Sequence, residues 1–254
     1  MFYSTVIILC SRRVVNQLKQ PLEAIDVATK PQIRLKPRIL DDTIGDLFLP
    51  QQISLFHGPE RAPLSTLAHA AVVSAARMGT SCVFLDSGSN YSPALMKSLC
   101  HSKDELIKVL EKVVVGSVLG LDDVVEKIKM MKNFGEVSLV VLDSLTGTLN
   151  LTGAPGSRNR QRNLFTTLDA IRRVINDTNA HVMITDHSSR DWTSGKTSPI
   201  GGNILAHAVD SVVLVDRLRN KENMVRILVE RCTLPSPPPG VIVKLGPKGI
   251  RSIR

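Results

Sequence analysis

An apolar run, a glycine and two hydroxyl side chains follow one another in residues 53–67, which read ISLFHGPERAPLSTL. This order matches a phosphate-binding P-loop, G-x-x-x-x-G-K-[ST], in which a strand leads through a glycine-rich turn into a helix. Gly58 takes the place of the first glycine, and Ser65 that of the hydroxyl that ligates magnesium. The segment indicates nucleotide chemistry, and its candidate contacts are Gly58, Pro59, Glu60, Arg61, Ser65 and Thr66.

Two residues of this segment depart from the P-loop pattern. Pro63 stands where the second glycine is expected, and Leu64 stands where the lysine is expected. Proline lacks the N–H donor and fixes φ near about −65°, while leucine has no ammonium group to contact the β- and γ-phosphates. Because a charge-assisted hydrogen bond contributes about 1.5–3 kcal/mol, the affinity for ATP falls by about tenfold to hundredfold. The sequence therefore predicts that ATP and magnesium bind weakly or not at all.

Four other segments carry a resemblance to a known family. Residues 139–144, LVVLDS, have the form of a Walker B strand that ends in Asp143, and residues 199–208 read PIGGNILAHA. Leu-Pro at 234–235 and Gly-Ile-Arg at 249–251 follow. Together with the loop above, these runs resemble the ATPase core of the RecA/RadA recombinase superfamily, in its archaeal and eukaryotic branch. The resemblance covers nearly the whole chain and favours a core-only RadA paralogue of the archaeal RadB/RadC kind with a degenerate Walker A motif.

The resemblance implies roles for several residues. Ser65 and Asp143 would hold Mg²⁺ if a nucleotide binds, and His207 matches a histidine that senses the γ-phosphate across a subunit interface. A hydrogen-bonded histidine that opens a helix is the alternative interpretation of His207. The glutamate that activates water in the family is replaced by Gly88, and the usual Asn-Gln sensor reads Asp-His at 186–187. ATP hydrolysis by the family mechanism is therefore not expected.

The resemblance also implies two loops that face DNA, after the third and fourth core strands. They correspond to residues 150–163 and 187–201, and their candidate DNA contacts are Arg158, Arg160, Arg162, Arg190, Trp192 and Lys196. Guanidinium and ammonium groups on such loops give salt-dependent, sequence-tolerant binding to phosphates. An unpaired base stacked on Trp192 adds about 1–3 kcal/mol. The next pair of arginines, Arg172 and Arg173, is expected on the solvated surface.

The elements that must position these residues alternate between short β-branched runs and longer segments of helical period. We expect strands over residues 53–57, 82–86, 139–143, 181–185, 211–215, 224–231 and 241–245. We expect helices over residues 64–78, 92–100, 102–114, 121–132 and 161–176. This alternation predicts an α/β fold, a RecA-like P-loop core whose twisted, mostly parallel sheet is flanked by helices, with antiparallel strands at its C-terminal end. An N-terminal arm over residues 1–37 is expected to lead into one core domain over residues 38–254.

Composition limits the class of protein. The 254 residues include 32 Lys+Arg and 23 Asp+Glu, which give a net charge of +9 and allow a polyanionic partner. The four cysteines are scattered without a CxxC pair, which argues against a zinc site and favours a reducing compartment. The longest early apolar run, residues 6–10, is far shorter than the ~20 residues that span a bilayer. We expect a cytoplasmic protein at the nucleoid, or a nuclear one in a eukaryote, with no membrane partner.

The sequence is compatible with three functions. The first is a recombinase paralogue that assists or regulates homologous recombination and DNA repair, with DNA (single-stranded DNA in particular) and a RadA-type recombinase or another paralogue as partners. The second is a deviant but active DNA-dependent ATPase. The third is a non-catalytic RecA-fold scaffold subunit of a larger complex. The Phe-x-x-Ala motif by which RadA-type recombinases polymerise is missing from the first 45 residues, so a self-assembled filament is not expected.

Overall fold

The computed structural model describes residues 33–190, 197–218, 221, 223–246 and 249–253. Its strands are β1 (Ile53–Gly58), β2 (Ser81–Asp86), β3 (Val113–Ser117), β4 (Val137–Asp143), β5 (His181–Arg190), β6 (Thr197–Pro199), β7 (Ser211–Arg217), β8 (Met224–Arg231), β9 (Val241–Gly246) and β10 (Gly249–Ser252). Its α-helices are α2 (Arg38–Ile44), α3 (Arg61–Arg77), α4 (Pro93–Leu99), α5 (Lys103–Leu110), α6 (Leu121–Met130), α7 (Leu145–Asn150), α8 (Arg158–Thr178) and α9 (Gly202–Ala208). Two 3₁₀ turns, η2 (Gly45–Leu47) and η3 (Met131–Phe134), complete the described elements.

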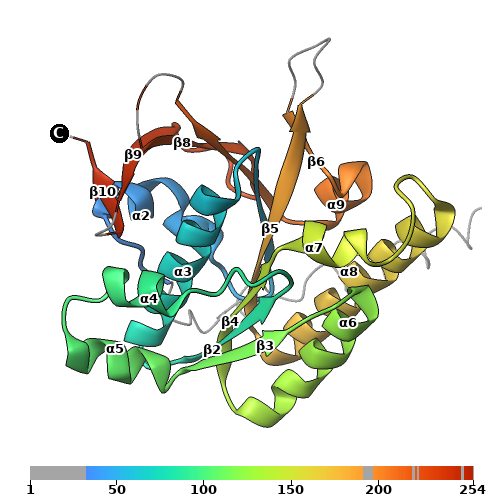
Figure 1. Cartoon of the computed structure of the whole chain (residues 1–254), viewed down its shortest axis with the longest axis horizontal. Coiled ribbons are helices and arrows are strands. Elements are labelled where there is room, and N and C mark those ends of the chain that lie inside the picture. The colour runs from blue at the N-terminus through green and yellow to red at the C-terminus, as the bar shows by residue number, and fades with distance from the viewer. Residues whose placement is uncertain (1–32, 191–196, 219–220, 222, 247–248, 254) are drawn as a thin grey trace, which may run out of the picture. The chain divides into compact units, whose positions relative to one another are not determined.

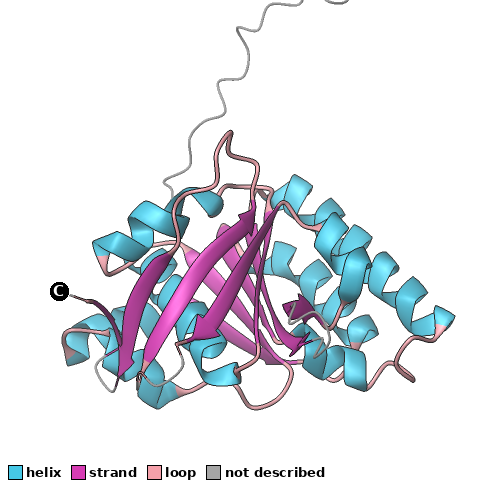
Figure 2. Cartoon of the chain, turned by 90° about the horizontal axis from the view of Figure 1, so that it is seen from above, coloured by secondary structure: helices cyan, strands magenta, loops and turns pink. Residues whose placement is uncertain are grey.

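One twisted sheet joins all the described strands, in the order β10-β9-β8-β7-β1-β5-β4-β2-β3, and β6 pairs with β5 beside it (Figure 2). The six strands from β7 to β3 in this order are parallel, whereas β8, β9 and β10 are antiparallel to their neighbours. This confirms the predicted parallel core with an antiparallel C-terminal extension. The strands β2 to β5 lie on one side of β1, and the chain then crosses to β7 on its other side. The carboxyl ends of β1, β5 and β4 therefore lie at the position where such sheets bind ligands.

Helices cover both faces of the sheet (Figure 1). On one face α3, α4 and α5 pack against side chains such as Phe56 and Phe84. On the other face α6, α7, α8 and α9 pack against Leu55 and Leu142. Adjacent residues of β1 therefore enter different cores, as the two-residue repeat of a strand requires. Both faces of the central strands are buried, which explains why their sequences are apolar runs and do not alternate.

Two of the expected boundaries differ from the structure. The helix expected over residues 102–114 ends at Leu110, and the β-branched run from Val113 forms β3 at the edge of the sheet. The fourth core strand continues to Arg190 and folds back through β6. Most of the expected arm over residues 1–37 lies outside the described residues. Ile33 and Leu35 are already buried in the core, before α2 begins.

Candidate functional site

The segment that resembles a P-loop is short and largely helical. β1 ends at Gly58 and α3 begins at Arg61, so only Pro59 and Glu60 connect them. A P-loop needs a longer turn whose successive N–H groups surround a phosphate. Here Pro63 lies in the first turn of α3, where its missing N–H removes one of the free donors at the helix start.

Two positions show how tightly this turn is packed. A Cβ atom at Gly58 would overlap the carbonyl oxygen of Val215 on the neighbouring strand β7, so glycine is required there. Leu64, at the expected lysine position, is 1% exposed and belongs to the core between α3 and the sheet. The position therefore points away from the carboxyl edge of the sheet and into the apolar layer.

The charged residues of the turn are already engaged. The guanidinium of Arg61 donates to the carbonyl oxygen of Gly88, the residue at the position of the family's glutamate. The carboxylate of Glu60 pairs with Arg217 of β7 at 2.8 Å. Thr66 donates to the carbonyl oxygen of Ala62 one turn earlier in α3, at 2.8 Å. These contacts join the turn to β7 and to the loop after β2.

Asp143 lies at the end of β4 and is 1% exposed. Its two carboxylate oxygens accept hydrogen bonds from Ser65 at 2.6 Å and from Thr185 at 2.7 Å. Burial raises the pKa of Asp143, and the two hydroxyl donors oppose this shift. The peptide bond from Asp143 to Ser144 is cis.

A nucleotide site needs residues that bind Mg²⁺ and residues that bind phosphate, and this structure suits only the first. The Ser65 hydroxyl donates to Asp143 and keeps its oxygen lone pairs, so this pair suits an oxygen-seeking cation such as Mg²⁺. The phosphate half does not fit, because the turn is two residues long, Leu64 is buried and Arg61 is bound to Gly88. We therefore derive no chemical step through ATP.

The sensor position and the PIGGNILAHA run are connected through Asp186. This carboxylate is fully buried and accepts hydrogen bonds from the hydroxyl of Thr146 and, at 3.0 Å, from the N–H of Gly201. Burial raises the pKa of Asp186, and the bonds from Thr146 and Gly201 lower it. The N–H of His187 donates to Thr146 at 2.9 Å. The start of α9 is thus fastened to the middle of β5.

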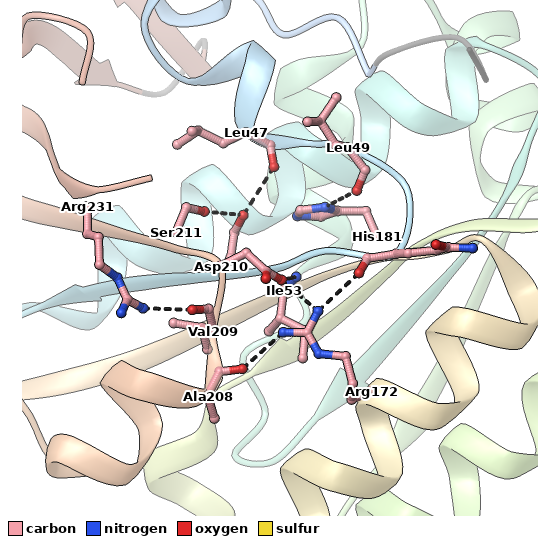
Figure 3. Close-up of polar contacts among 12 residues, drawn as sticks. Leu47, Leu49, Ile53, Arg172, His181, Ala208, Val209, Asp210, Ser211 and Arg231 are labelled. Carbon is pink, nitrogen blue, oxygen red and sulfur yellow. Dashed lines mark hydrogen bonds and ion pairs between the residues drawn. The ribbon is translucent and has the colours of Figure 1, made fainter. Parts of the chain in front are cut away.

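The other end of α9 is held by two arginines (Figure 3). Arg172 pairs with Asp210 at 2.7 Å and donates to the carbonyl oxygen of Ala208 at 3.0 Å. Arg231 donates to the carbonyl oxygens of Ala206 and Val209. Positive side chains at a helix C-terminus satisfy its free carbonyl groups and complement its dipole.

Two expectations about this region are corrected. Arg172 is only partly exposed, because it holds Asp210 and the end of α9. Arg173 lies on the solvated surface as expected, paired with Asp169 at 2.8 Å. His207 does not open a helix, because it is exposed in the last turn of α9. One signal for Arg172 was present in the sequence: it lies one turn after the buried Leu168, whereas Arg173 lies one turn after Asp169.

The arginines expected on the first DNA loop lie on a helix. Arg158, Arg160 and Arg162 form the first turns of α8, and the hydroxyl of Ser157 accepts from the N–H of Arg160 at the N-cap. Arg158 and Arg162 are exposed, but Arg160 is 7% exposed. The second expected loop is the β5–β6 hairpin, with Arg190 as the last residue of β5. Trp192 and Lys196 lie outside the described residues.

Comparison with known proteins identifies the family of this fold and site. The family model described as Rad51 matches residues 32–251, which is most of the chain. The chain belongs to the Rad51 family. It is 26% identical over 177 residues to the DNA repair and recombination protein RadB of Thermoplasma volcanium, covering 66% of this chain and 70% of that one. It is 24% identical over 232 residues to the DNA repair protein RAD51 of Mycosarcoma maydis, covering 83% of this chain and 67% of that one.

The fold of this Rad51-family chain also matches a solved structure. The crystal structure of the RadB recombinase is similar with a TM-score of 0.70 at 17% identity, and the similarity covers 85% of this chain and 96% of that one. Together with the family match, this confirms the resemblance to the RecA/RadA superfamily and to its RadB-like paralogues.

A cavity adjoins the first turns of α8 in this Rad51-family core. Its volume is about 540 Å³, and it lies between residues 149–156, the start of α8 and the start of α9. Arg160 lines it beside Gly201 and Gly202. A guanidinium that lines an open cavity is suited to bind an anion there.

Proposed function

We propose that this chain is a recombinase paralogue that assists or regulates homologous recombination and DNA repair by binding DNA, with ATP hydrolysis lost or strongly impaired. The observation that carries the DNA-binding part is the start of α8, where Arg158 and Arg162 are exposed and Arg160 lines a cavity. A phosphate in the cavity would pair with Arg160, and the flanking Arg158 and Arg162 extend the contact along a nucleic-acid backbone. The hairpin residues Arg190, Trp192 and Lys196 are proposed as the second part of this surface.

The proposed DNA contact is tested by salt-dependent binding to a fluorescent single-stranded oligonucleotide. The double variant Arg158→Ala/Arg162→Ala removes two exposed phosphate contacts and leaves the buried Arg160 in place. Each contact to single-stranded DNA contributes about −0.7 to the slope of log K against log salt, so the slope should weaken by about 1.4. Arg173→Ala is the matched control, because this arginine is exposed on the same helix and paired with Asp169. An unchanged slope in the double variant would remove the assignment.

The loss of hydrolysis is supported by the two-residue turn, the buried Leu64 and the glycine at position 88. Electrostatic stabilisation of the transferring phosphoryl group needs cations that are positioned in advance, and Arg61 is bound elsewhere. We expect no ATP turnover above background, with and without DNA.

The deviant ATPase remains the second candidate, because Ser65 and Asp143 keep an arrangement that suits Mg²⁺. Turnover in the unmodified protein that disappears in Asp143→Asn, with folding unchanged by circular dichroism, would establish this candidate and overturn the proposed loss of hydrolysis.

The proposed protein partner is a RadA-type recombinase or another paralogue, and the proposed location is the cytoplasm at the nucleoid, or the nucleus in a eukaryote. Within the described ranges, no helix is long and apolar enough to cross a membrane. Affinity purification of the full chain from its native host tests the partner. Recovery of a recombinase supports the proposal, whereas a stable complex of other subunits that binds no DNA favours the scaffold.

A further inference from the structure

The start of α8 carries positive charge at the end of the helix where positive charge is least favourable. Arg158, Arg160 and Arg162 lie in its first turns, and its first turn contains no acidic residue. The amino end of a helix is the positive end of its dipole, so cations there are unfavourable, and like charges at neighbouring positions add to this. A segment that keeps such charges, one of them buried beside a cavity, is built for a bound anion.

An aromatic ring continues the same exposed stripe of this helix. Phe165 is 63% exposed. At about 100° per residue, it lies about 20° around the helix from Arg158 and about 60° from Arg162. The rise of about 1.5 Å per residue places it about 4.5 Å beyond Arg162 along the axis. The next residue of this stripe, Asp169, is neutralised by Arg173, so the positive part of the stripe ends at the ring.

We propose that Phe165 stacks on an unpaired base of a single-stranded nucleic acid whose phosphates are bound by Arg158 and Arg162 on the surface and by Arg160 in the cavity. This inference rests on the proposed function and assigns its substrate class. Figure 1 shows the first turns of α8 beside α9, at the same side of the molecule as the β5–β6 hairpin. A strand that follows the arginines toward the body of α8 meets the ring directly after the second exposed guanidinium.

The chemistry of the stripe distinguishes a single strand from other occupants. The bases of a duplex are stacked on one another and their faces are hidden, so an exposed ring on a rigid helix gains nothing from them. An unpaired base offers a free π-face, and stacking of this kind tolerates any base. A single strand has a phosphate backbone from which its bases project. The cations of the stripe can therefore bind the phosphates while the aromatic ring stacks on a base.

The test compares three probes of equal length with the full chain: oligo-dT, an abasic oligonucleotide and a duplex. Phe165→Ala should weaken binding to oligo-dT about 5- to 150-fold and leave binding to the abasic strand and to the duplex unchanged. Phe165→Trp should retain the affinity for oligo-dT, and Phe165→Leu should lose it although it remains apolar. Phe134→Ala removes another exposed phenylalanine, from η3, and is the matched control.

The outcomes separate this inference from the proposed function. If Phe165→Ala binds oligo-dT like the unmodified chain while Arg158→Ala/Arg162→Ala does not, the stacking role is overturned and DNA binding by α8 stands. Equal losses on oligo-dT and on the abasic strand also overturn stacking. Capture of a recombinase that depends on Phe165, with unchanged binding to oligo-dT, assigns the ring to a protein partner instead. If the unmodified chain binds none of the probes, both proposals fail.

Discussion

Replacing Leu64 by lysine tests whether this phosphate loop was lost by substitution alone or was rebuilt as a helix. The change restores the residue type that a P-loop has at this position. If only the side chain were missing, Leu64→Lys would return a cation to the carboxyl edge of the sheet. In the structure, however, Leu64 is 1% exposed within the core that α3 forms with the sheet. We expect the variant to be strongly destabilised and to bind no ATP.

The magnitude follows from two costs. Removing a fully buried leucine side chain loses about 1.5–3 kcal/mol of hydrophobic stabilisation. A lysine in that place stays neutral at pH 7 only if its pKa falls from about 10.4 to below 7, and each unit costs about 1.4 kcal/mol. The second cost is therefore about 4–5 kcal/mol, and the sum is about 6–8 kcal/mol. That is comparable to the entire stability of a typical domain, about 5–15 kcal/mol.

Urea denaturation at pH 7 measures this loss. With a slope of about 3 kcal/mol per molar, the midpoint should fall by about 2 M, or the variant should be unfolded without urea. Leu64→Met is the control, because a swap that conserves volume costs less than about 1.5 kcal/mol. A Leu64→Lys protein with a midpoint close to that of the unmodified chain, or with ATP binding in equilibrium dialysis, would refute the reasoning about the start of α3.

Three further changes test other parts of the structure. Burial lowers the pKa of His181 from 6.5 to about 4, so as the pH falls this imidazole is protonated in the unfolded chain before it is protonated in the folded one. The free energy of unfolding therefore keeps its full value above about pH 7 and falls by about 3 kcal/mol toward pH 4. Urea titrations at several pH values should show this loss in the unmodified chain and not in His181→Phe. Arg172→Ala should cost about 1–3 kcal/mol and speed amide hydrogen exchange in residues 204–209, whereas Arg173→Ala should change stability by less than about 0.5 kcal/mol. Thr185→Val should lower the free energy of unfolding by about 1–3 kcal/mol in urea denaturation, because it removes a donor to the buried Asp143. Thr185→Ser keeps the hydroxyl and should therefore retain most of this stability.

The central strands were predictable because burial on both faces leaves an unmistakable apolar run. The residues of β1 and β4 are such runs, and each ends at a residue of the candidate site. β3 was not predicted, because its valines follow a helical segment without a turn residue and its edge position leaves it only partly buried. β3 is recognised as a strand by its pairing with β2, and such a pairing cannot be seen in the sequence.

The placement of the first proposed DNA-binding segment was missed for a different reason. Residues 158–163 are all polar, so the apolar period that indicates a helix begins only at Leu164. The N-cap was the available signal, because Ser157 precedes the run and its hydroxyl accepts a backbone N–H three residues on. The family resemblance placed the arginines in a loop, whereas the cap begins a helix there, with Arg160 buried and Arg158 and Arg162 exposed.

The survival of Ser65 and Asp143 needs no nucleotide to explain it. Asp143 is 1% exposed at the end of a central strand, and a carboxylate so buried is costly unless hydroxyl or N–H donors satisfy it. Ser65 and Thr185 supply those donors from the two neighbouring elements. Losing either donor destabilises the fold, so the pair can persist after the phosphate half of the site has gone. Evidence about nucleotide binding therefore comes from the positions that do not satisfy this buried carboxylate, and in this chain those positions hold Pro63, Leu64 and Gly88.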